Sequence, residues 1–232
     1  MSNKEEYKEI CRLHPEIPVF SQYWWMSASC GDNWDVLIIR DKNDNIIATM
    51  PYAIFKKFGF TLISQHEFCQ HTGPFIFYPD SIYSGRLSTY KKLAFEEKIF
   101  QNIIDLLEEL HADMFWQNFS PRVTNHLPFH WDGFKQYTRY TYRLPNIGDP
   151  EELFSRFCKS KQQYIHKAQK KGFVTTFDMS ADDFLDFHRR TYKERGMDDL
   201  LDKWDCKHII EEAKKNGHGA IVCTKDSEGE PL

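Results

Sequence analysis

Apolar and polar positions alternate in short runs near the start of the chain and predict a β-hairpin. The runs Trp34–Arg40 and Ile46–Tyr52 are apolar, and the polar stretch DKNDN separates them. Asn and Asp between two apolar runs are typical of a hairpin turn. Phe60–Ser64 and Phe75–Tyr78 have the composition of further strands, so this region predicts a mostly antiparallel sheet.

Segments with helical periodicity lie before and after these predicted strands in the sequence. Residues 3–13 and Phe20–Cys30 read as two helices ahead of the hairpin, and Tyr90–Leu110 has the longest helical pattern. The stripe that this last helix would bury consists of Leu93, Phe100, Ile103, Ile104, Leu107 and Leu110. Ala112–Gln117 is predicted to be a buried strand and Phe134–Leu144 a further strand, before a linker at 145–150.

The stretch Phe154–Gly172 predicts a basic amphipathic helix with no acidic residue. One arc is apolar, and the opposite arc holds Arg156, Lys159, Lys167, Lys170 and Lys171. Lys161 falls within the apolar arc. An ammonium group is costly to bury unpaired, so Lys161 must reach water, an acidic partner or an anionic ligand. Gly172 is expected to end the helix as its C′ residue.

The rest of the chain predicts a strand at Phe173–Phe177, a helix capped by Ser180, a helix at Cys206–Asn216 and a strand at Ala220–Thr224. VLIIRDKNDNII and AIVCTKDSEGEPL share one layout, which indicates a weak internal repeat at an offset of roughly 185 residues. Coincidence is the alternative, since strand–turn–strand patterns are common. The second copy stops after its turn, so we expect a second lobe that is incomplete.

Composition narrows the class of protein. The chain is 41% hydrophobic and 28% charged with a formal net charge of −4, so the basic helix stands out against an acidic remainder. This favours local anion binding over a general nucleic-acid coat, and no DNA partner is expected. Six scattered cysteines without a C-x-x-C pair indicate reduced, structural thiols. No apolar run has the length of a membrane span, and we expect a cytoplasmic protein.

Several stretches carry a family resemblance as an ensemble. They are FSQYWWMSASCGDNWDV with IIATMPY, QHTGPF, FSPRVTNHLPFHWDGFKQYTRYTYRL, and KSKQQYIHKAQKKGF followed by DDFLDFHRRTYKERGM. Together they resemble the Fem-type peptidyltransferase branch of the GNAT-like N-acyltransferases, over nearly the whole chain. The resemblance implies an α+β fold of two GNAT-like lobes in tandem, at 1–145 and 146–232. It also implies transfer of an acyl or aminoacyl group onto an amine.

The resemblance leaves the donor open. In Fem-type enzymes the donor is an aminoacyl-tRNA and the acceptor is a peptidoglycan precursor. An acyl-CoA site would need a loop of the form Arg/Gln-x-x-Gly-x-Gly/Ala, but the position before the long helix reads YSGRLSTYKK. Fem-type chains also commonly have an arginine where this chain has Gln162 and Gln163. We expect acyl-CoA or aminoacyl-tRNA as a donor substrate and no tightly bound cofactor.

The candidate binding residues fall into two groups. Lys159, Lys161, Lys167 and Lys170 would hold the phosphates of a nucleotide-linked acceptor or of a tRNA, and Arg139 would add a cation facing the cleft. An ordinary solvated lysine face is the alternative. Gln65, His71 and Thr72 would line the acceptor cleft. The spacing of His66, Glu67, Cys69 and His71 is too tight for a typical zinc site, so no metal is expected.

No catalytic residue is assigned, although the acceptor amine must lose a proton. His188, Asp186, Glu194 and Asp198 are candidates for the general base. The aromatic cluster from Trp116 to Tyr142 predicts core and inter-lobe packing, with a base-stacking surface as the alternative. The sequence thus predicts an acyl- or aminoacyl-transferase acting on a small-molecule or nucleotide-linked amine. The alternative is a catalytically inactive module that binds an anionic or nucleotide-linked ligand.

Overall fold

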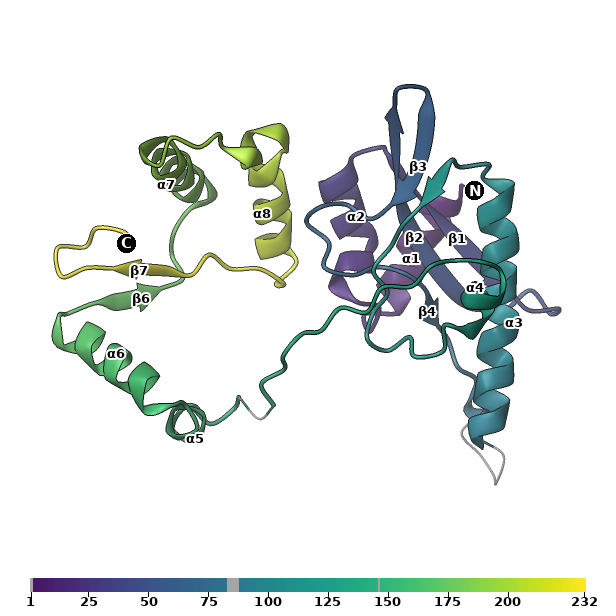
Figure 1. Ribbon diagram of the computed structural model, residues 1–232, viewed down its shortest axis with the longest axis horizontal. Coiled ribbons are helices and arrows are strands. Elements are labelled where there is room, and N and C mark those ends of the chain that lie inside the picture. The colour runs from purple at the N-terminus through teal and green to yellow at the C-terminus, as the bar shows by residue number, and fades with distance from the viewer. Residues whose placement is uncertain (1, 83–87, 146) are drawn as a thin grey trace. The chain divides into compact units, whose positions relative to one another are not determined.

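The computed structural model describes residues 2–82, 88–145 and 147–232, and the chain divides into two compact units (Figure 1). Unit 1 is Met1–Gln136 and unit 2 is Tyr137–Leu232. The fold is α+β with mostly antiparallel strands, which confirms the expected class. No helix in the described ranges combines the length and apolar content needed to cross a membrane.

The predicted hairpin is the centre of unit 1. Strands β1 (Trp34–Arg40) and β2 (Ile46–Lys57) pair antiparallel from Trp34 opposite Ala53 to Arg40 opposite Ile46. Strand β2 continues past the expected end at Tyr52. Its last residues pair with β3 (Phe60–Ser64), which lies where the sequence placed it.

Both faces of this hairpin are buried, which explains why its strands are nearly continuous apolar runs. Trp34 and Val36 pack against α1 (Asn3–Leu13) and α2 (Tyr23–Cys30). Leu37 and Ile39 point to the opposite face and pack against α3 (Ser88–Glu109). Alternate residues of a strand point to opposite faces, so each face receives one set. Figure 1 shows the sheet of unit 1 between these helices.

Two short strands complete the sheet. Strand β4 (Phe75–Ile76) pairs antiparallel with β2, and β5 (Met114–Phe115) pairs parallel with β3. The predicted buried strand at Ala112–Gln117 is therefore shorter than expected. Met114 is also 54% exposed, because β5 is an edge strand with β3 as its one ladder partner. The 3-10 turns Val19–Ser21 and Asp80–Ile82 and α4 (Leu127–Trp131) fill the connections.

Helix α3 buries most of the stripe expected from its sequence. Phe100, Ile103, Ile104 and Leu107 are buried against the sheet, and Leu110 packs at the edge of this core. Leu93 is 47% exposed and does not belong to the stripe. One turn further along, Glu96 is buried and accepts a hydrogen bond of 2.5 Å from the Tyr78 hydroxyl. The first turns of α3 therefore combine this buried polar contact with the packing of Phe95 against the apolar core.

Unit 2 contains a smaller sheet and a smaller core. Its helices are α5 (Pro150–Ser155), α6 (Lys159–Lys170), α7 (Ala181–Glu194) and α8 (Cys206–Lys215), with a 3-10 turn at Leu200–Lys203. Strands β6 (Val174–Thr176) and β7 (Cys223–Lys225) pair antiparallel. Met179, Ile221 and Cys223 form the core with Phe184 of α7 and Ile210 of α8.

One prediction near the start of unit 2 is wrong. The expected strand Phe134–Leu144 has no strand pairing and is extended chain. Of the aromatic cluster, Phe119, Phe129 and Phe134 pack in the core of unit 1, as expected. The packing of the later tyrosines between the lobes stays a prediction. Alternation by itself does not supply a partner strand, and a strand without a ladder has unpaired backbone groups.

The turns after β1 and β7 have the same hydrogen-bond geometry. Asp41 Oδ1 accepts from the N–H groups of Asn43 and Asn45, and Asp226 Oδ1 accepts from those of Glu228 and Glu230. The fourth residue of each turn has a positive φ, 66° at Asp44 and 90° at Gly229. The two aspartates are 185 residues apart, and Lys225 and Pro231 form an isolated antiparallel bridge after the second turn. Hairpin turns of this kind are common, so the internal repeat stays a prediction.

The two-sided core predicts a large effect of truncation on the buried face of α3. Ile103→Ala should lower the free energy of unfolding by about 2–5 kcal/mol, because it removes apolar contacts and leaves a cavity. Urea unfolding followed by circular dichroism measures this difference. The control is Tyr90→Ala on the same helix, where the side chain is 69% exposed and a change within about 0.5 kcal/mol is expected. Equal losses from both variants would contradict the assignment of the buried face.

Candidate functional site

The basic stretch folds as two helices rather than the single helix expected. Helix α5 ends at Ser155, and α6 begins at Lys159 with Cys158 as its N-cap. The side-chain amide of Gln162 holds the junction, since Nε2 lies within 3.0–3.3 Å of the carbonyl oxygens of Phe154, Ser155 and Phe157. The helix therefore breaks where a side chain satisfies the last carbonyls of α5. Gln162 therefore has a structural role at the junction of α5 and α6.

The end of α6 follows its prediction. Gly172 has a φ of +76°, and its N–H donates to the Gln169 carbonyl at 3.0 Å. The Phe173 N–H donates to the Ala168 carbonyl at 3.1 Å. These two bonds form a Schellman motif, which needs a residue that tolerates the left-handed region. Gly172 thus turns the chain directly from α6 into β6.

Lys159, Lys161, Lys167 and Lys170 lie on α6 and are exposed. None of the four ammonium groups forms an ion pair with a carboxylate in the described part of the chain. Other lysines of unit 2 do have such partners, among them Lys207, which lies 2.8 Å from Asp182. No residue of α6 is buried, so Lys161 reaches water without a partner. Lys159, Lys167 and Lys170 share one face of α6 over about 16 Å, and Lys161 lies on the opposite face.

The other predicted binding residues lie on different parts of the chain. Arg139 is exposed on the extended segment at the start of unit 2. Gln65 and Thr72 are buried in unit 1 and His71 is half-buried there. Gln65 Nε2 donates to the Cys69 carbonyl at 2.7 Å, and its Oε1 accepts from the Asn118 N–H at 2.8 Å. The role of Gln65, His71 and Thr72 in binding an acceptor stays a prediction.

The loop that contains these three residues is held tightly in unit 1. The Thr72 N–H donates to the Asn118 carbonyl at 2.9 Å, and Thr72 forms an isolated parallel β-bridge with Phe119. Gly73 follows with a φ of +85°, and a Cβ there would lie 2.5 Å from the Phe119 ring. A larger residue at position 73 would therefore have to displace that ring. The side chain of Thr72 is buried, and its Oγ1 has no hydrogen-bond partner among the described residues.

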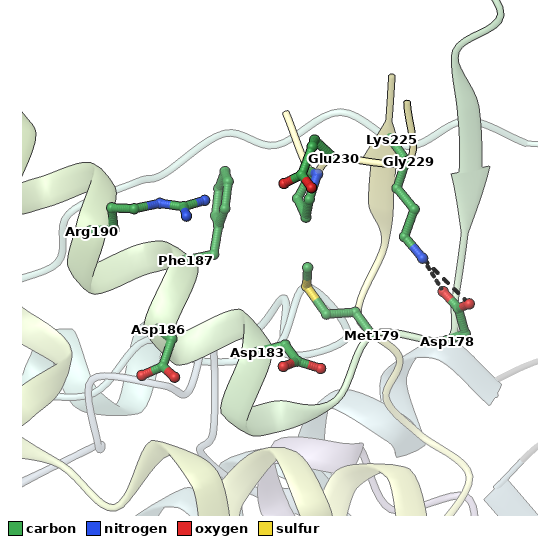
Figure 2. Close-up of a pocket in the computed structure, with 10 residues that line it drawn as sticks. Asp178, Met179, Asp183, Asp186, Phe187, Arg190, Lys225, Gly229 and Glu230 are labelled. Atoms are coloured by element: carbon green, nitrogen blue, oxygen red, sulfur yellow. Dashed lines mark hydrogen bonds and ion pairs between the residues drawn. The ribbon is translucent and has the colours of Figure 1, made fainter. Parts of the chain in front are cut away.

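Unit 2 also has an open cavity of about 550 Å³ that the sequence did not indicate (Figure 2). None of the predicted binding residues lines it. Its walls come from α7 and from the segments around β6 and β7, with Asp178, Met179, Asp183, Asp186, Phe187, Arg190, Lys225, Gly229, Glu230 and Pro231 as lining residues. The four carboxylates outnumber the two cations. Figure 2 shows Lys225 directed at Asp178, with Nζ 3.3 Å from Oδ1.

Both cations at the cavity already have partners. The Thr176 hydroxyl and then the Lys225 ammonium lower the pKa of the Asp178 carboxyl. The Arg190 guanidinium lies over the Phe187 ring, 5.5 Å from its centroid. A polar ligand in this cavity would have to compete with both contacts. The cavity is thus a less favourable anion site than the unpaired lysines of α6.

The six thiols differ in exposure. Cys158 is exposed at the start of α6, whereas Cys11, Cys30, Cys69, Cys206 and Cys223 are buried. The hydroxyl of Ser160 and the backbone N–H of Lys161 lower the pKa of Cys158. Burial raises the pKa of Cys30 to about 11 and that of Cys69 to about 12. Cys158 therefore differs from the five buried thiols in both exposure and the direction of its pKa shift.

Comparison with known proteins adds little. No protein-family model and no curated protein matches this sequence. Two solved structures of mutants of the BH1408 protein from Bacillus halodurans are similar to part of it. The first is 13% identical, with a TM-score of 0.29 over 62% of this chain and 88% of that chain. The second is 14% identical, with a TM-score of 0.29 over 61% and 87%. A similarity this low carries no argument.

The exposure of Cys158 predicts selective alkylation. In the native protein at pH 7.5, iodoacetamide should modify Cys158 about tenfold faster or more than any other cysteine, because the thiolate is the reactive form and the others are buried. Peptide mapping by mass spectrometry measures the rate at each site. Cys158→Ser should abolish the fast phase, and urea should make the remaining five thiols react. Fast native alkylation at Cys69 would contradict the structure.

The surroundings of two histidines in unit 1 predict that the stability of the folded protein decreases in acid. Burial lowers the pKa of His66, and burial followed by the charge of Arg122 lowers that of His71. The unfolded chain then binds protons first, so stability falls as the pH drops below the ordinary imidazole value of about 6.5. The urea midpoint should decrease from pH 7.5 to pH 5.5, and less so in His71→Gln or His66→Gln. His130→Gln, at an exposed position, should leave the decrease unchanged. Parallel decreases in all variants would contradict this origin.

Proposed function

We propose that this protein transfers an acyl or aminoacyl group onto an amine and that α6 binds an anionic substrate. The observation that carries the proposal is the group of exposed, unpaired lysines of α6 at 159, 161, 167 and 170. The sequence resemblance to Fem-type and GNAT-like transferases supports the reaction type. The equivalent turns of the two units support the tandem arrangement that this resemblance implies.

Charge within unit 2 is strongly polarised, which supports an anionic ligand. Residues 137–177 contain eight Arg or Lys and three Asp or Glu, a formal charge of +5. Residues 178–232 contain nine Arg or Lys and fourteen Asp or Glu, a formal charge of −5. The cations of α6 are therefore not neutralised by neighbouring carboxylates along the chain. An uncompensated group of this kind attracts phosphate groups and also sets the orientation of a ligand.

The proposed chemistry needs no covalent intermediate on the protein. The acceptor amine attacks the activated acyl carbonyl of an acyl-CoA or an aminoacyl-tRNA, and the protein contributes positioning and anion binding. Both donors carry phosphates, as does a nucleotide-linked acceptor. The lysines of α6 fit any of these ligands through the same contacts. We further propose that the protein acts in the cytoplasm, where such donors are present.

A charge-matched pair of variants tests the role of α6. Replacing Lys159, Lys161 and Lys167 by Ala should weaken binding of coenzyme A or deacylated tRNA about tenfold or more at 0.1 M salt, and should reduce the salt dependence of binding. Replacing Lys207, Lys214 and Lys215 of α8 by Ala removes the same charge from a different helix. This control should bind as the wild type does. Isothermal titration calorimetry measures coenzyme A, and filter binding measures the tRNA.

The comparison separates a local site from net charge. Equal weakening by both triple variants would show attraction to the overall charge, and no weakening by the α6 variant would remove α6 from the site. The reaction is tested separately, by the release of free thiol from acetyl-CoA and the transfer of label from aminoacyl-tRNA to amine acceptors. Binding without transfer to any acceptor would favour a binding module over a transferase.

A further inference from the structure

A histidine and an aspartate that are eleven residues apart meet beside α7. His188 lies on α7, and Asp199 lies in the loop that follows this helix. His188 Nδ1 is 3.1 Å from Asp199 Oδ1. The side chains are 20% and 6% exposed, so the contact is largely removed from water. An interaction of this kind between two ionisable groups is much stronger than at the surface.

Each partner is held by a second contact. Asp199 Oδ1 accepts from the Leu201 N–H at 2.9 Å, which orients the carboxylate. The imidazole ring stacks on Tyr192, with centroids 4.3 Å apart and planes inclined by 24°. Phe184 lies on the other side along the helix, with its centroid 6.0 Å from that of the imidazole. The ring is therefore constrained by α7 itself as well as by the loop.

The two ring nitrogens of His188 have different surroundings. Nδ1 is fully buried and lies 3.1 Å from Asp199 Oδ1, and the geometry of this contact falls outside that of a hydrogen bond. Nε2 has no hydrogen-bond partner among the described residues. Because a fifth of the side chain remains exposed, Nε2 is the atom that can reach a bound molecule. A carboxylate at Nδ1 favours the tautomer that carries its proton there, which leaves a lone pair on Nε2.

From this geometry we propose that His188 is the general base of the acyl transfer and that Asp199 is its positioning residue. The inference rests on the proposed function. The amine nitrogen attacks the carbonyl carbon and forms the new C–N bond, while Nε2 removes a proton from that nitrogen. The bond to the donor's sulfur or oxygen then breaks, and the imidazolium returns the proton to this leaving atom. No further reactant is needed.

The three carboxylates among the sequence's candidates for the general base are less suitable than His188. Asp186 is 77% exposed and is already paired with the Arg189 guanidinium at 2.8 Å. Glu194 and Asp198 are exposed. On α8, which packs against α7, Lys207 pairs with Asp182, and Lys214 donates to the Met179 carbonyl. Asp199 is thus the charged group placed to orient His188.

The test combines kinetics with an observation that does not need turnover. In a transfer assay with the full chain, His188→Gln should lower kcat about 100-fold or more. Asp199→Asn should lower kcat less, because the imidazole stays in place without its positioning carboxylate. His208→Gln, on the exposed side of α8, should leave kcat unchanged. Long-range ¹H–¹⁵N NMR spectra should show neutral His188 with its proton on Nδ1, and Asp199→Asn should remove this preference.

The outcomes separate the two proposals. If wild type transfers acyl groups and His188→Gln does so equally well with the native circular dichroism spectrum, the assignment of His188 is overturned and the proposed function stands. If no combination of donor and acceptor reacts, the proposed function fails. The NMR result then decides whether Asp199 orients His188. A proton on Nε2 overturns the inferred orientation, and a proton on Nδ1 that depends on Asp199 supports it.

Discussion

Burial of both faces of the β1–β2 hairpin is the constraint on which unit 1 depends. Trp34 and Val36 need α1 and α2, whereas Leu37 and Ile39 need α3. The helices on the two faces are therefore tied to the same strands. One edge of β2 pairs with β1. The other edge pairs with both β3 and β4, because these two strands return to β2 at different points along its length. A slip of one residue would exchange the two faces, so the register of the hairpin is strongly determined.

Unit 2 repeats the turn of that hairpin without the same enclosure. The Asp226 turn has the bonding of the Asp41 turn, but its sheet has two strands and a core of few residues. Local hydrogen bonds are enough to form such a turn, whereas a large core needs elements on both faces. The candidate chemistry nevertheless lies here, in groups that are held by short-range contacts. Gln162 and Gly172 define α6, and Asp199 and Tyr192 hold His188.

The two proposed roles in unit 2 depend on opposite environments. The lysines of α6 are exposed and unpaired, so they attract anions at long range and release them easily. His188 is mostly buried beside a carboxylate, so its orientation is well defined and its chemistry depends on that one partner. A transferase needs both kinds of group, because it must collect charged substrates and must also move a proton at one atom.

The sequence by itself determined the elements with strong periodicity or turn chemistry. The first helix, the hairpin, β3, the cap at Ser180 and the end of α6 at Gly172 all follow from local patterns. Only the tertiary structure decided which apolar runs find a partner. In the structure Phe134–Leu144 forms no strand, the basic stretch breaks between Ser155 and Lys159, and Leu93 and Cys158 are exposed. The His188–Asp199 contact was also beyond the sequence, because it depends on how the loop after α7 folds back. Local patterns report the preferences of neighbouring residues, whereas pairing and burial depend on residues distant in the chain.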